Sequence, residues 1–344
     1  MFITIDKKTL LAELKTASIV AELNVNIRAD DKLTFTATNG RIFVKTVCDA
    51  EIKQPGAITL DCHRLYGIIS VMPNESITIQ SDDNHWVTIT ADKTHFYIPG
   101  VPADEFPEFP KFPDGEMITL PYMELMSKIG YALATEQTQG TLCGARILIK
   151  DGILEAVATD GHRLALLKTD CDNTLDCVIP RKVLDLIKTD VQLIVANDIY
   201  VKTDTMSIVA HAIEGHYPNY KLVMPDVCEI KVYFNRERLM QAIKRASVMT
   251  PETFFGIIFK LDNGMFYIEC DNEMGSVKDQ FEIDYCGTPF ITSYNPKYLL
   301  DALQHIDTNE VIFNANSQDG PAIITPCDTD NYQCLIMPMR MRER

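Results

Sequence analysis

The stretch VATDGHRLALLKT at residues 157–169 repeats the pattern of TATNGRIFVKT at residues 36–46. In both, an alternating apolar run meets an Asp-Gly or Asn-Gly pair, and a second apolar run follows. These pairs between apolar runs are the strongest short-range signal for a β-hairpin, because both residues accept the positive φ of a tight turn. We therefore expect a hairpin at each place. The offset of 121 residues from Thr38 to Thr159 indicates an internal repeat.

Helical patterns stand at matching places around these hairpins. Six ranges have apolar residues at three- and four-residue spacing or a polar or proline start, as amphipathic helices do. They are Lys7–Leu14, Asp61–Ile69, Tyr122–Ile129, Pro180–Ile187, Arg236–Ala246 and Asn295–Leu303. The order helix, hairpin, helix, hairpin thus occurs three times. This order predicts an α+β fold of three repeated domains.

Proline and glycine separate the repeats. The pattern is interrupted at Pro113-Asp114-Gly115 and at Met224-Pro225-Asp226. The motifs FPEF at 106–109 and YPNY at 217–220 close the first and second repeats in the same way. We therefore expect domains at 1–115, 116–224 and 225–344, and a chain of 344 residues is long enough for several cores.

Composition excludes several classes of protein. The chain is 46% hydrophobic and 23% charged, it has no apolar run of the roughly 20 residues that a membrane helix needs, and its start lacks the apolar region of a secretory signal. These features predict a cytoplasmic protein. None of the ten cysteines forms a Cys-x-x-Cys pair, the histidines lack metal-ligand spacing, and phosphate-binding loops are absent, so we expect no metal and no cofactor.

Charge is distributed unevenly. The 32 basic and 48 acidic residues give a net charge of −16, which argues against binding nucleic acid through bulk charge. The helical stretches nevertheless sum to +6, chiefly from 6–15, 180–189 and 235–246. Lys and Arg are good helix formers on solvated faces, so this excess has an ordinary explanation. The alternative is a basic helical lining inside an acidic shell.

One constellation invites a catalytic interpretation. Asp160, His162 and Arg163 place a carboxylate, an imidazole and a guanidinium within four residues. Successive residues at a hairpin turn are expected to point in different directions, and no nucleophile elbow lies nearby. We therefore expect a turn here, and no enzymatic activity.

Four motifs together resemble the bacterial beta sliding clamp family, the beta subunit of DNA polymerase III. They are IPGVPADEFP at 98–107, ATDGHRLA at 158–165, IPRK at 179–182 and IMPMR at 336–340. The resemblance implies three domains of one topology and a closed head-to-tail homodimer. In that ring, helices line a central hole for duplex DNA and antiparallel sheets lie outside. It also implies a processivity factor that tethers the replicative DNA polymerase, the clamp loader and other replication or repair partners, without sequence-specific DNA contacts.

The resemblance also implies three sets of site residues. A pocket for partner peptides is expected from Leu142, Thr159, Gly161, His162, Arg163, Leu164, Pro218, Leu222, Val223, Phe254, Asn295, Tyr298, Pro321, Leu335, Ile336, Met337, Pro338, Met339, Arg340 and Met341. In this pocket, Arg163 is expected to orient the peptide. The expected DNA-facing residues are Lys7, Lys15, Arg181, Lys182, Lys188, Arg236, Arg238, Lys244 and Arg245. The expected dimer interface contains Phe96, Ile98, Val248 and Met249.

The chain departs from the family pattern in three places. The stretch 18–26 is shortened, 136–140 lacks the aromatic and Arg residues that members often present to DNA, and Arg342–Arg344 extends the usual end. These departures leave an alternative open, a peptide-binding scaffold of clamp fold that no longer encircles DNA.

Overall fold

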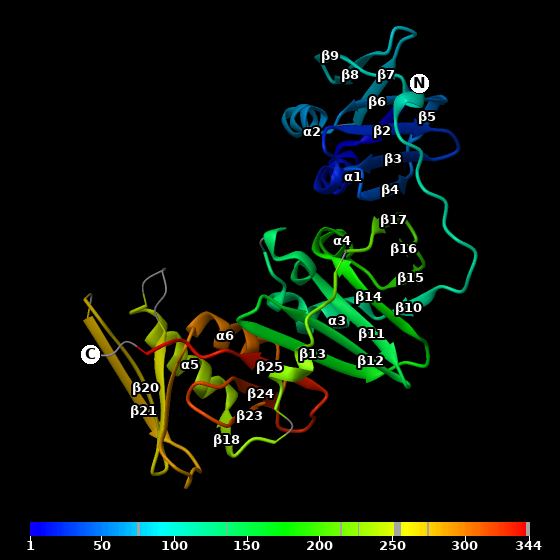
Figure 1. The fold of residues 1–344 in the computed structure, drawn as a ribbon. Helices are drawn as coiled ribbons and strands as arrows, with labels where there is room; N and C mark the ends of the chain where they lie inside the picture. Colours follow the sequence, from blue (N-terminus) through cyan, green and yellow to red (C-terminus); the bar gives the residue numbers. More distant parts are fainter. Residues whose placement is uncertain are drawn as a thin grey trace. The chain divides into compact units, whose positions relative to one another are not determined.

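The computed structural model describes residues 1–73, 76–135, 137–213, 215–225, 227–250, 256–273 and 275–341, without the side chains of 137–139. Phe254 and the 342–344 extension therefore lie outside the described residues. The chain divides into two compact units, each formed by two segments (Figure 1). The first unit is Met1–Tyr122 with Ile179–Ala212, and the second is Met123–Val178 with Ile213–Arg344.

The first unit contains two antiparallel sheets, in the orders β5-β1-β7-β8-β9 and β10-β15-β16-β17-β4-β3-β2-β6. Its strands are β1 (Phe2–Asp6), β2 (Asn24–Ala29), β3 (Leu33–Thr38), β4 (Ile42–Cys48), β5 (Glu51–Gln54), β6 (Gly56–Asp61), β7 (Ser76–Ser81), β8 (Trp86–Ala91), β9 (Thr94–Pro99), β10 (Ile118–Leu120), β15 (Val191–Val195), β16 (Asp198–Lys202) and β17 (Met206–His211). Its helices are α1 (Lys7–Val20), α2 (Cys62–Val71) and α4 (Arg181–Leu186), with a 3₁₀ turn η1 (Ala103–Glu105).

The second unit also contains two antiparallel sheets, in the orders β14-β11-β12-β13-β25-β24-β23-β18 and β21-β20-β19-β22. Its strands are β11 (Gly144–Lys150), β12 (Ile153–Thr159), β13 (Arg163–Asp170), β14 (Leu175–Pro180), β18 (Ile230–Asn235), β19 (Ile257–Asp262), β20 (Met265–Asn272), β21 (Gly275–Glu282), β22 (Phe290–Tyr294), β23 (Glu310–Ala315), β24 (Ala322–Pro326) and β25 (Tyr332–Ile336). Its helices are α3 (Tyr122–Ile129), α5 (Arg236–Ser247) and α6 (Pro296–Gln304), with 3₁₀ turns η2 (Gly130–Ala132), η3 (Gln137–Cys143) and η4 (Tyr220–Val223).

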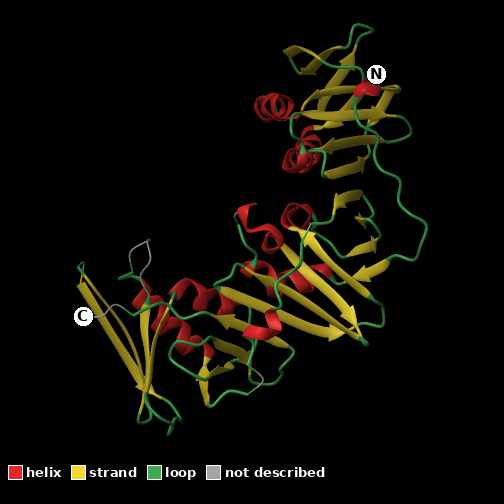
Figure 2. Ribbon diagram, in the orientation of Figure 1, coloured by secondary structure: helices red, strands yellow, loops and turns green. Residues whose placement is uncertain are grey.

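One motif of a strand, a helix and three strands occurs six times in chain order, as in β1-α1-β2-β3-β4. Strands predominate over helices in both units (Figure 2). Four of the six helices begin at an Asp or Asn whose side chain accepts the orphan backbone N–H groups of the first turn: Asp6, Asp61, Asn235 and Asn295. The six helices predicted from the sequence are confirmed, although α1 extends to Val20, six residues beyond the predicted end. Two motifs form each of the three repeats expected from the sequence. The α+β prediction with antiparallel sheets is confirmed.

Two predicted hairpin turns have the same geometry. Gly40 and Gly161 lie in the left-handed region, with φ of 79° and 86°. In the first turn, Asn39 Oδ1 accepts from the backbone N–H of Arg41 at 3.0 Å. In the second, Asp160 Oδ1 does the same for His162 at 3.0 Å. Both glycines are therefore required by the turn, because a Cβ at positive φ is strained.

Each eight-stranded sheet continues from one repeat into the next. In the first unit β4 pairs with β17, where Val44 lies opposite Ile208. In the second unit β13 pairs with β25, where Leu164 lies opposite Leu335. Because of this continuity, each of the two compact units combines strands of two repeats. The units therefore do not coincide with the expected repeats, and the domain boundaries at 115 and 224 stay a prediction.

Candidate peptide-binding site

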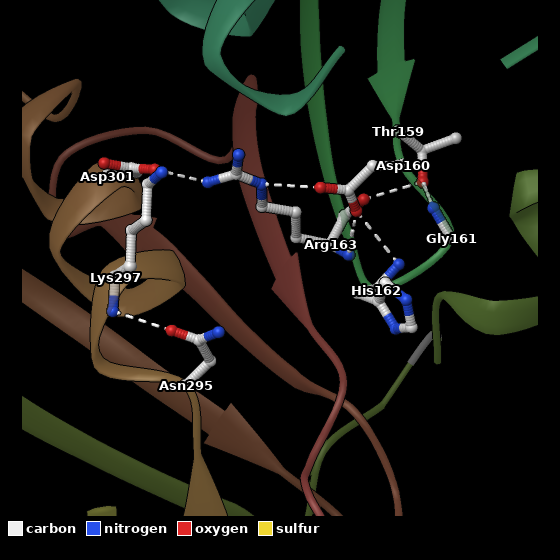
Figure 3. Close-up of polar contacts among 8 residues, drawn as sticks. All are labelled: Thr159, Asp160, Gly161, His162, Arg163, Asn295, Lys297 and Asp301. Atoms are coloured by element: carbon white, nitrogen blue, oxygen red, sulfur yellow. Dashed lines mark hydrogen bonds and ion pairs between the residues drawn. The ribbon is translucent and has the colours of Figure 1, made fainter. Parts of the chain in front are cut away.

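The β12–β13 hairpin turn is held by a dense set of local hydrogen bonds (Figure 3). Thr159 Oγ1 accepts from the Gly161 N–H at 3.1 Å and donates to the Arg163 carbonyl at 2.6 Å. Asp160 Oδ1 accepts from the N–H groups of His162 and Arg163, both at 3.0 Å. The turn therefore has a fixed shape before any ligand binds, and the His162 side chain lies on its exposed side.

The Arg163 guanidinium lies in a protein-lined slot. Its Nε donates to Asp160 Oδ2 at 3.0 Å and its Nη1 donates to Asp301 Oδ2 at 2.5 Å. Its Cζ lies 4.5 Å from the ring centre of Tyr298 and 5.4 Å from that of Tyr131. Only 11% of the side chain is exposed. Burial disfavours the charged form, but the two carboxylates outweigh it and raise the pKa of Arg163.

The structure bears on two expectations about this constellation. Successive turn residues were expected to point in different directions, but the side chains of Asp160 and Arg163, three positions apart, form an ion pair at 3.0 Å. Arg163 Nε and Nη1 donate to Asp160 and Asp301, so this residue holds the hairpin against α6. Its expected role in orienting a bound peptide stays a prediction.

The C-terminal segment lies beside the same hairpin. The Met337 N–H donates to the His162 carbonyl at 2.9 Å, and the Met339 N–H donates to the Ser293 carbonyl at 2.7 Å. A Cβ placed on Gly256 would lie 2.1 Å from Ser293 Oγ and 3.2 Å from Met339 Sδ. The absence of a side chain at Gly256 therefore lets the C-terminal segment lie close to β22.

A pocket of about 350 Å³ opens next to Met337. Its lining includes four residues that the sequence predicted for the peptide site: Leu222, Val223, Pro321 and Met337. It also includes four that sequence reasoning missed: Pro225, Asn316, Ser317 and Gly320. The last three come from the β23–β24 turn. The pocket volume lies in the range of small ligand sites, and its walls are mostly apolar. The pocket can therefore accommodate an apolar side chain of a partner.

One wall of this pocket is the short turn η4. Leu222 and Val223 are 82% and 46% exposed, an unusual exposure for apolar residues. The turn is fixed by Tyr220, which is buried and whose hydroxyl donates to the Glu155 carboxylate. Burial raises the pKa of Glu155, but hydrogen bonds from Tyr220 and Lys221 outweigh it, so the pKa lies below its ordinary value. The buried hydrogen bond between Tyr220 and Glu155 thus holds the exposed Leu222 and Val223 in place.

The remaining predicted pocket residues fall into three groups. Three of them are core residues with at most 3% exposure: Leu164, Leu335 and Ile336. Met337, which lines the pocket, packs against the cluster that contains Leu164 and Leu335. Their expected contact with a peptide stays a prediction. Half-buried or exposed residues near the turn, α6 and the C-terminal segment are Leu142, Thr159, Gly161, His162, Pro218, Asn295, Tyr298, Pro338, Met339, Arg340 and Met341. Phe254 lies outside the described residues.

Several of the predicted DNA-facing residues already have intramolecular partners. Lys7 Nζ donates to the carbonyls of Ser70 and Met72 at the end of α2, and Arg236 Nη1 donates to the Leu303 carbonyl in α6. Arg181 pairs with Asp185, Arg238 lies over Phe281, and Arg245 pairs with Asp279. Within the predicted DNA-facing set, the exposed lysines that form no ion pair with another described residue are Lys15, Lys182, Lys188 and Lys244. These four have the greatest freedom to meet an anion.

The predicted interface residues lie at two sheet ends. Phe96 and Ile98 belong to β9, the end strand of its sheet, and Ile98 is buried while Phe96 is half-buried. Val248 and Met249 follow α5 and adjoin β20 and β21, since Met249 accepts from Asn272 Nδ2 and lies close to Gly275. Val248 is 79% exposed.

Metal binding and membrane insertion find no support in the described part of the chain. In the described ranges, no group of three or more His, Cys, Asp or Glu side chains is placed to hold a metal ion. Among the helices of the same ranges, none has the length and apolar character needed to span a membrane.

The sixfold motif, the sheets that continue between repeats and the pocket beside the C-terminal segment together define a protein of the DNA-clamp class. Family models of the DNA polymerase III beta subunit match almost the whole chain, with the N-terminal domain at residues 1–110, the central domain at 120–219 and the C-terminal domain at 221–340. The chain therefore belongs to the DNA polymerase III beta subunit family, the beta sliding clamps.

Relatives agree with this assignment. The chain is 29% identical to the beta sliding clamp of Staphylococcus epidermidis over 84% of this chain and 81% of the relative. It is 25% identical to that of Pseudomonas aeruginosa over 99% and 100%. Among solved structures, the C. crescentus beta sliding clamp is 25% identical with a TM-score of 0.90 over 99% of each chain. The Bacillus subtilis sliding clamp is 24% identical with a TM-score of 0.89 over 99% and 100%, which supports the fold.

Proposed function

We propose that this chain closes head to tail with a second copy into a ring around duplex DNA, and that it tethers the replicative polymerase and other partners through the pocket beside Met337. The observation that carries this proposal is a pattern of strand pairing. In the β4–β17 and β13–β25 joints, the last strand of one motif pairs with the last strand of another. Of the six motif-ending strands, β9 and β21 remain as end strands of their sheets.

Pairing β9 of one copy with β21 of the other would form a third joint of the same kind. An unpaired edge exposes backbone N–H and C=O groups, and ring closure would satisfy them. The edges lie at the first and third repeats, so the contact is heterologous. Two such contacts close a dimer. Phe96 and Ile98 on β9, with Val248 and Met249 beside β21, are the proposed interface residues.

The charge distribution supports passage of DNA through the ring. The six helices hold 12 basic and 5 acidic side chains, whereas the whole chain has 32 and 48. An acidic protein with basic helices can surround DNA without gripping it, because few phosphates are neutralised. Retention would then be topological, and the contacts sequence-independent.

The pocket supports a tethering role. Leu222, Val223 and Met337 offer adaptable apolar walls, and each large apolar side chain buried there would contribute roughly 1.5–3 kcal/mol. After ordering costs, a short peptide would bind with about micromolar affinity, which allows partners to exchange. A related clamp from Pseudomonas aeruginosa, 25% identical, has been solved bound to griselimycin. That structure shows that a member of the family can bind a ligand, which is consistent with a binding pocket in this chain.

We further propose that the clamp acts without catalysis, metal or cofactor, in the cytoplasm. In the constellation of Asp160, His162 and Arg163, the carboxylate and the guanidinium pair with each other, and Arg163 also pairs with Asp301. A carboxylate held in this way is poorly placed to act with His162 in proton transfer to a substrate.

The decisive experiment compares DNA topologies. Clamp loaded on nicked circular DNA is expected to remain there and to leave once the circle is linearised, while moderate salt shortens its residence on circles only slightly. Replacing Lys182 and Lys244 with Gln should weaken loading while leaving the dimer intact, and Lys32→Gln on the surface serves as the matched control. Equal loss from circles and linear molecules would contradict encirclement and favour the scaffold alternative.

A further inference from the structure

A second pocket, of about 440 Å³, lies in the first unit, away from every residue discussed so far as a partner site. Apolar walls come from Leu23, Val101, Phe106 and flanking prolines, and Leu23 and Val101 are 56% and 37% exposed. Two carboxylates, Glu22 and Glu105, complete the rim. The lining contains no Lys, Arg or His. The pocket thus combines an apolar interior with a purely acidic edge.

Its walls are held by the backbone. The N–H and C=O of Val101 bond to the C=O and N–H of Thr59, at 2.9 and 3.1 Å. The Leu23 carbonyl accepts from the Cys62 N–H at 2.8 Å, and the Glu22 N–H donates to the Thr38 carbonyl at 3.3 Å. Beneath them, the buried Asn26 donates to Thr59 Oγ1 at 3.0 Å. Because both walls are fixed in this way, little ordering cost remains for a ligand.

The internal repeat relates this pocket to the partner site. Thr38 ends β3 as Thr159 ends β12, and Phe106-Pro107 corresponds to Tyr217-Pro218. Asn24 begins β2 as Gly144 begins β11, so Glu22 corresponds to Leu142. The first-unit pocket therefore occupies the place that, one repeat later, holds the predicted peptide-site residues Leu142, Thr159 and Pro218.

The two places differ in charge. Glu22 stands where the later repeat has Leu142, and Glu105 stands where it has His216. Neither acidic residue thus has an acidic counterpart in the second repeat. An apolar hollow with two carboxylates and no cation attracts a ligand that has both an apolar group and a positive charge.

We propose that this pocket is a second docking site, which takes a short protein segment with a leucine or aromatic side chain next to lysine or arginine. The apolar side chain enters between Leu23 and Phe106, and the cation pairs with Glu22 or Glu105. This inference goes beyond the proposed tethering function, which requires only the pocket beside Met337. It gives one subunit two separate partner sites of different charge preference.

The test uses the full-length protein with methyl-labelled Leu and Val, observed by NMR. The probe is the peptide acetyl-Lys-Leu-Phe-Lys-amide, and its charge-reversed control is acetyl-Glu-Leu-Phe-Glu-amide. The basic peptide is expected to shift the methyl signals of Leu23 and Val101 saturably, at least tenfold more tightly than the acidic one. The signals of Leu222 and Val223 report the other pocket in the same spectrum.

Variants separate the charge and burial contributions. Replacing Glu22 and Glu105 together with Gln is expected to weaken the basic peptide at least threefold, and replacing both with Lys at least tenfold, with other methyl signals unchanged. Leu23→Ala should weaken both peptides alike. Equal binding of the two peptides, or shifts confined to Leu222 and Val223, would overturn the proposal.

Discussion

Arg163 Nη1 and Asp301 Oδ2 lie 2.5 Å apart although 138 positions separate the two residues in the chain. Arg163 begins β13 and Asp301 lies in the middle of α6, so this contact joins the central and C-terminal repeats. Because the guanidinium also contacts Asp160 and two aromatic rings, a single side chain fixes the hairpin turn against the helix.

Removing the charge of Asp301 should therefore loosen the second unit. Asp301→Asn is expected to lower the free energy of unfolding by about 1–3 kcal/mol, the range for a hydrogen bond to a charged partner. The measurement is urea denaturation. The matched control is Asp49→Asn, which removes an exposed pair with Lys32 at 3.5 Å and should change stability by less than about 0.5 kcal/mol. Equal effects of both variants would contradict the role given to Asp301.

Gly256 should not tolerate a methyl group. Gly256→Ala would place Cβ against Ser293 Oγ, so we expect displacement of Met339 and a loss of peptide binding of fivefold or more. The matched control is Gly67→Ala in α2, where no atom lies within 4 Å. That variant should stabilise the protein by about 0.5–1 kcal/mol through helix propensity. Fluorescence anisotropy with a polymerase-derived peptide measures the first effect, and unchanged affinity in Gly256→Ala would count against it.

The anchor beneath η4 predicts a defined pH dependence. The folded-state pKa of Glu155 is lowered, so its stabilising contribution is present above the ordinary value of about 4.3 and is lost as pH falls through the lowered value. Wild type should thus be more stable than Glu155→Gln by a constant amount from pH 5 to 8, and the difference should shrink below about pH 4. Thermal melts of both proteins across this range measure it. A difference that grows on acidification would have the wrong sign.

The single tryptophan can report ring closure. Trp86 is 38% exposed in β8 and stacks on Tyr97 of β9 with ring centres 4.6 Å apart. Since β9 is the proposed interface strand, dilution into monomers should change the Trp86 emission. Val248→Asp combined with Met249→Asp should give monomers by light scattering and the monomer emission at all concentrations. A dimer mass in this variant would place the interface elsewhere.

The methionines of the C-terminal segment should contribute directly to partner binding. Met337→Ala combined with Met339→Ala removes apolar wall beside the pocket and is expected to cost about 1–3 kcal/mol of peptide binding, with the dimer intact. Val71→Ala, which truncates an exposed apolar side chain on α2, is the control and should bind peptide like wild type. Isothermal titration gives both affinities. Full affinity in the methionine variant would mean that the peptide binds elsewhere.

Local signals account for what could be predicted from the sequence. The hairpin turns at Gly40 and Gly161 follow from residues that are adjacent in the chain, and so do the helix starts at Asp6 and Asn295. Such features depend on backbone conformations that nearby residues allow. The family resemblance added the fold, while the place of the peptide site that it implies stays a prediction.

Contacts between distant segments account for what could not be predicted. Arg163 pairs with Asp301, and the pocket is lined by Asn316 and Gly320 together with Leu222. No local sequence pattern predicts that these distant residues lie close together. The burial of Leu335 also depends on contacts between distant segments. A strand with one solvent face alternates, but β25 has three consecutive buried residues because it is covered on both faces.

The β4–β17 and β13–β25 joints also dictate an order of events during synthesis. The sheet that begins with β2 near the N-terminus cannot be completed until β17, ending at His211, has left the ribosome. Residues 123–178 emerge before that moment, yet their own sheet waits for β25, which ends at Ile336. Early strands are therefore exposed until late ones arrive, and nascent chains with unpaired edges are the forms most prone to misassociation. The second unit can therefore close its large sheet only after β25 has been synthesised.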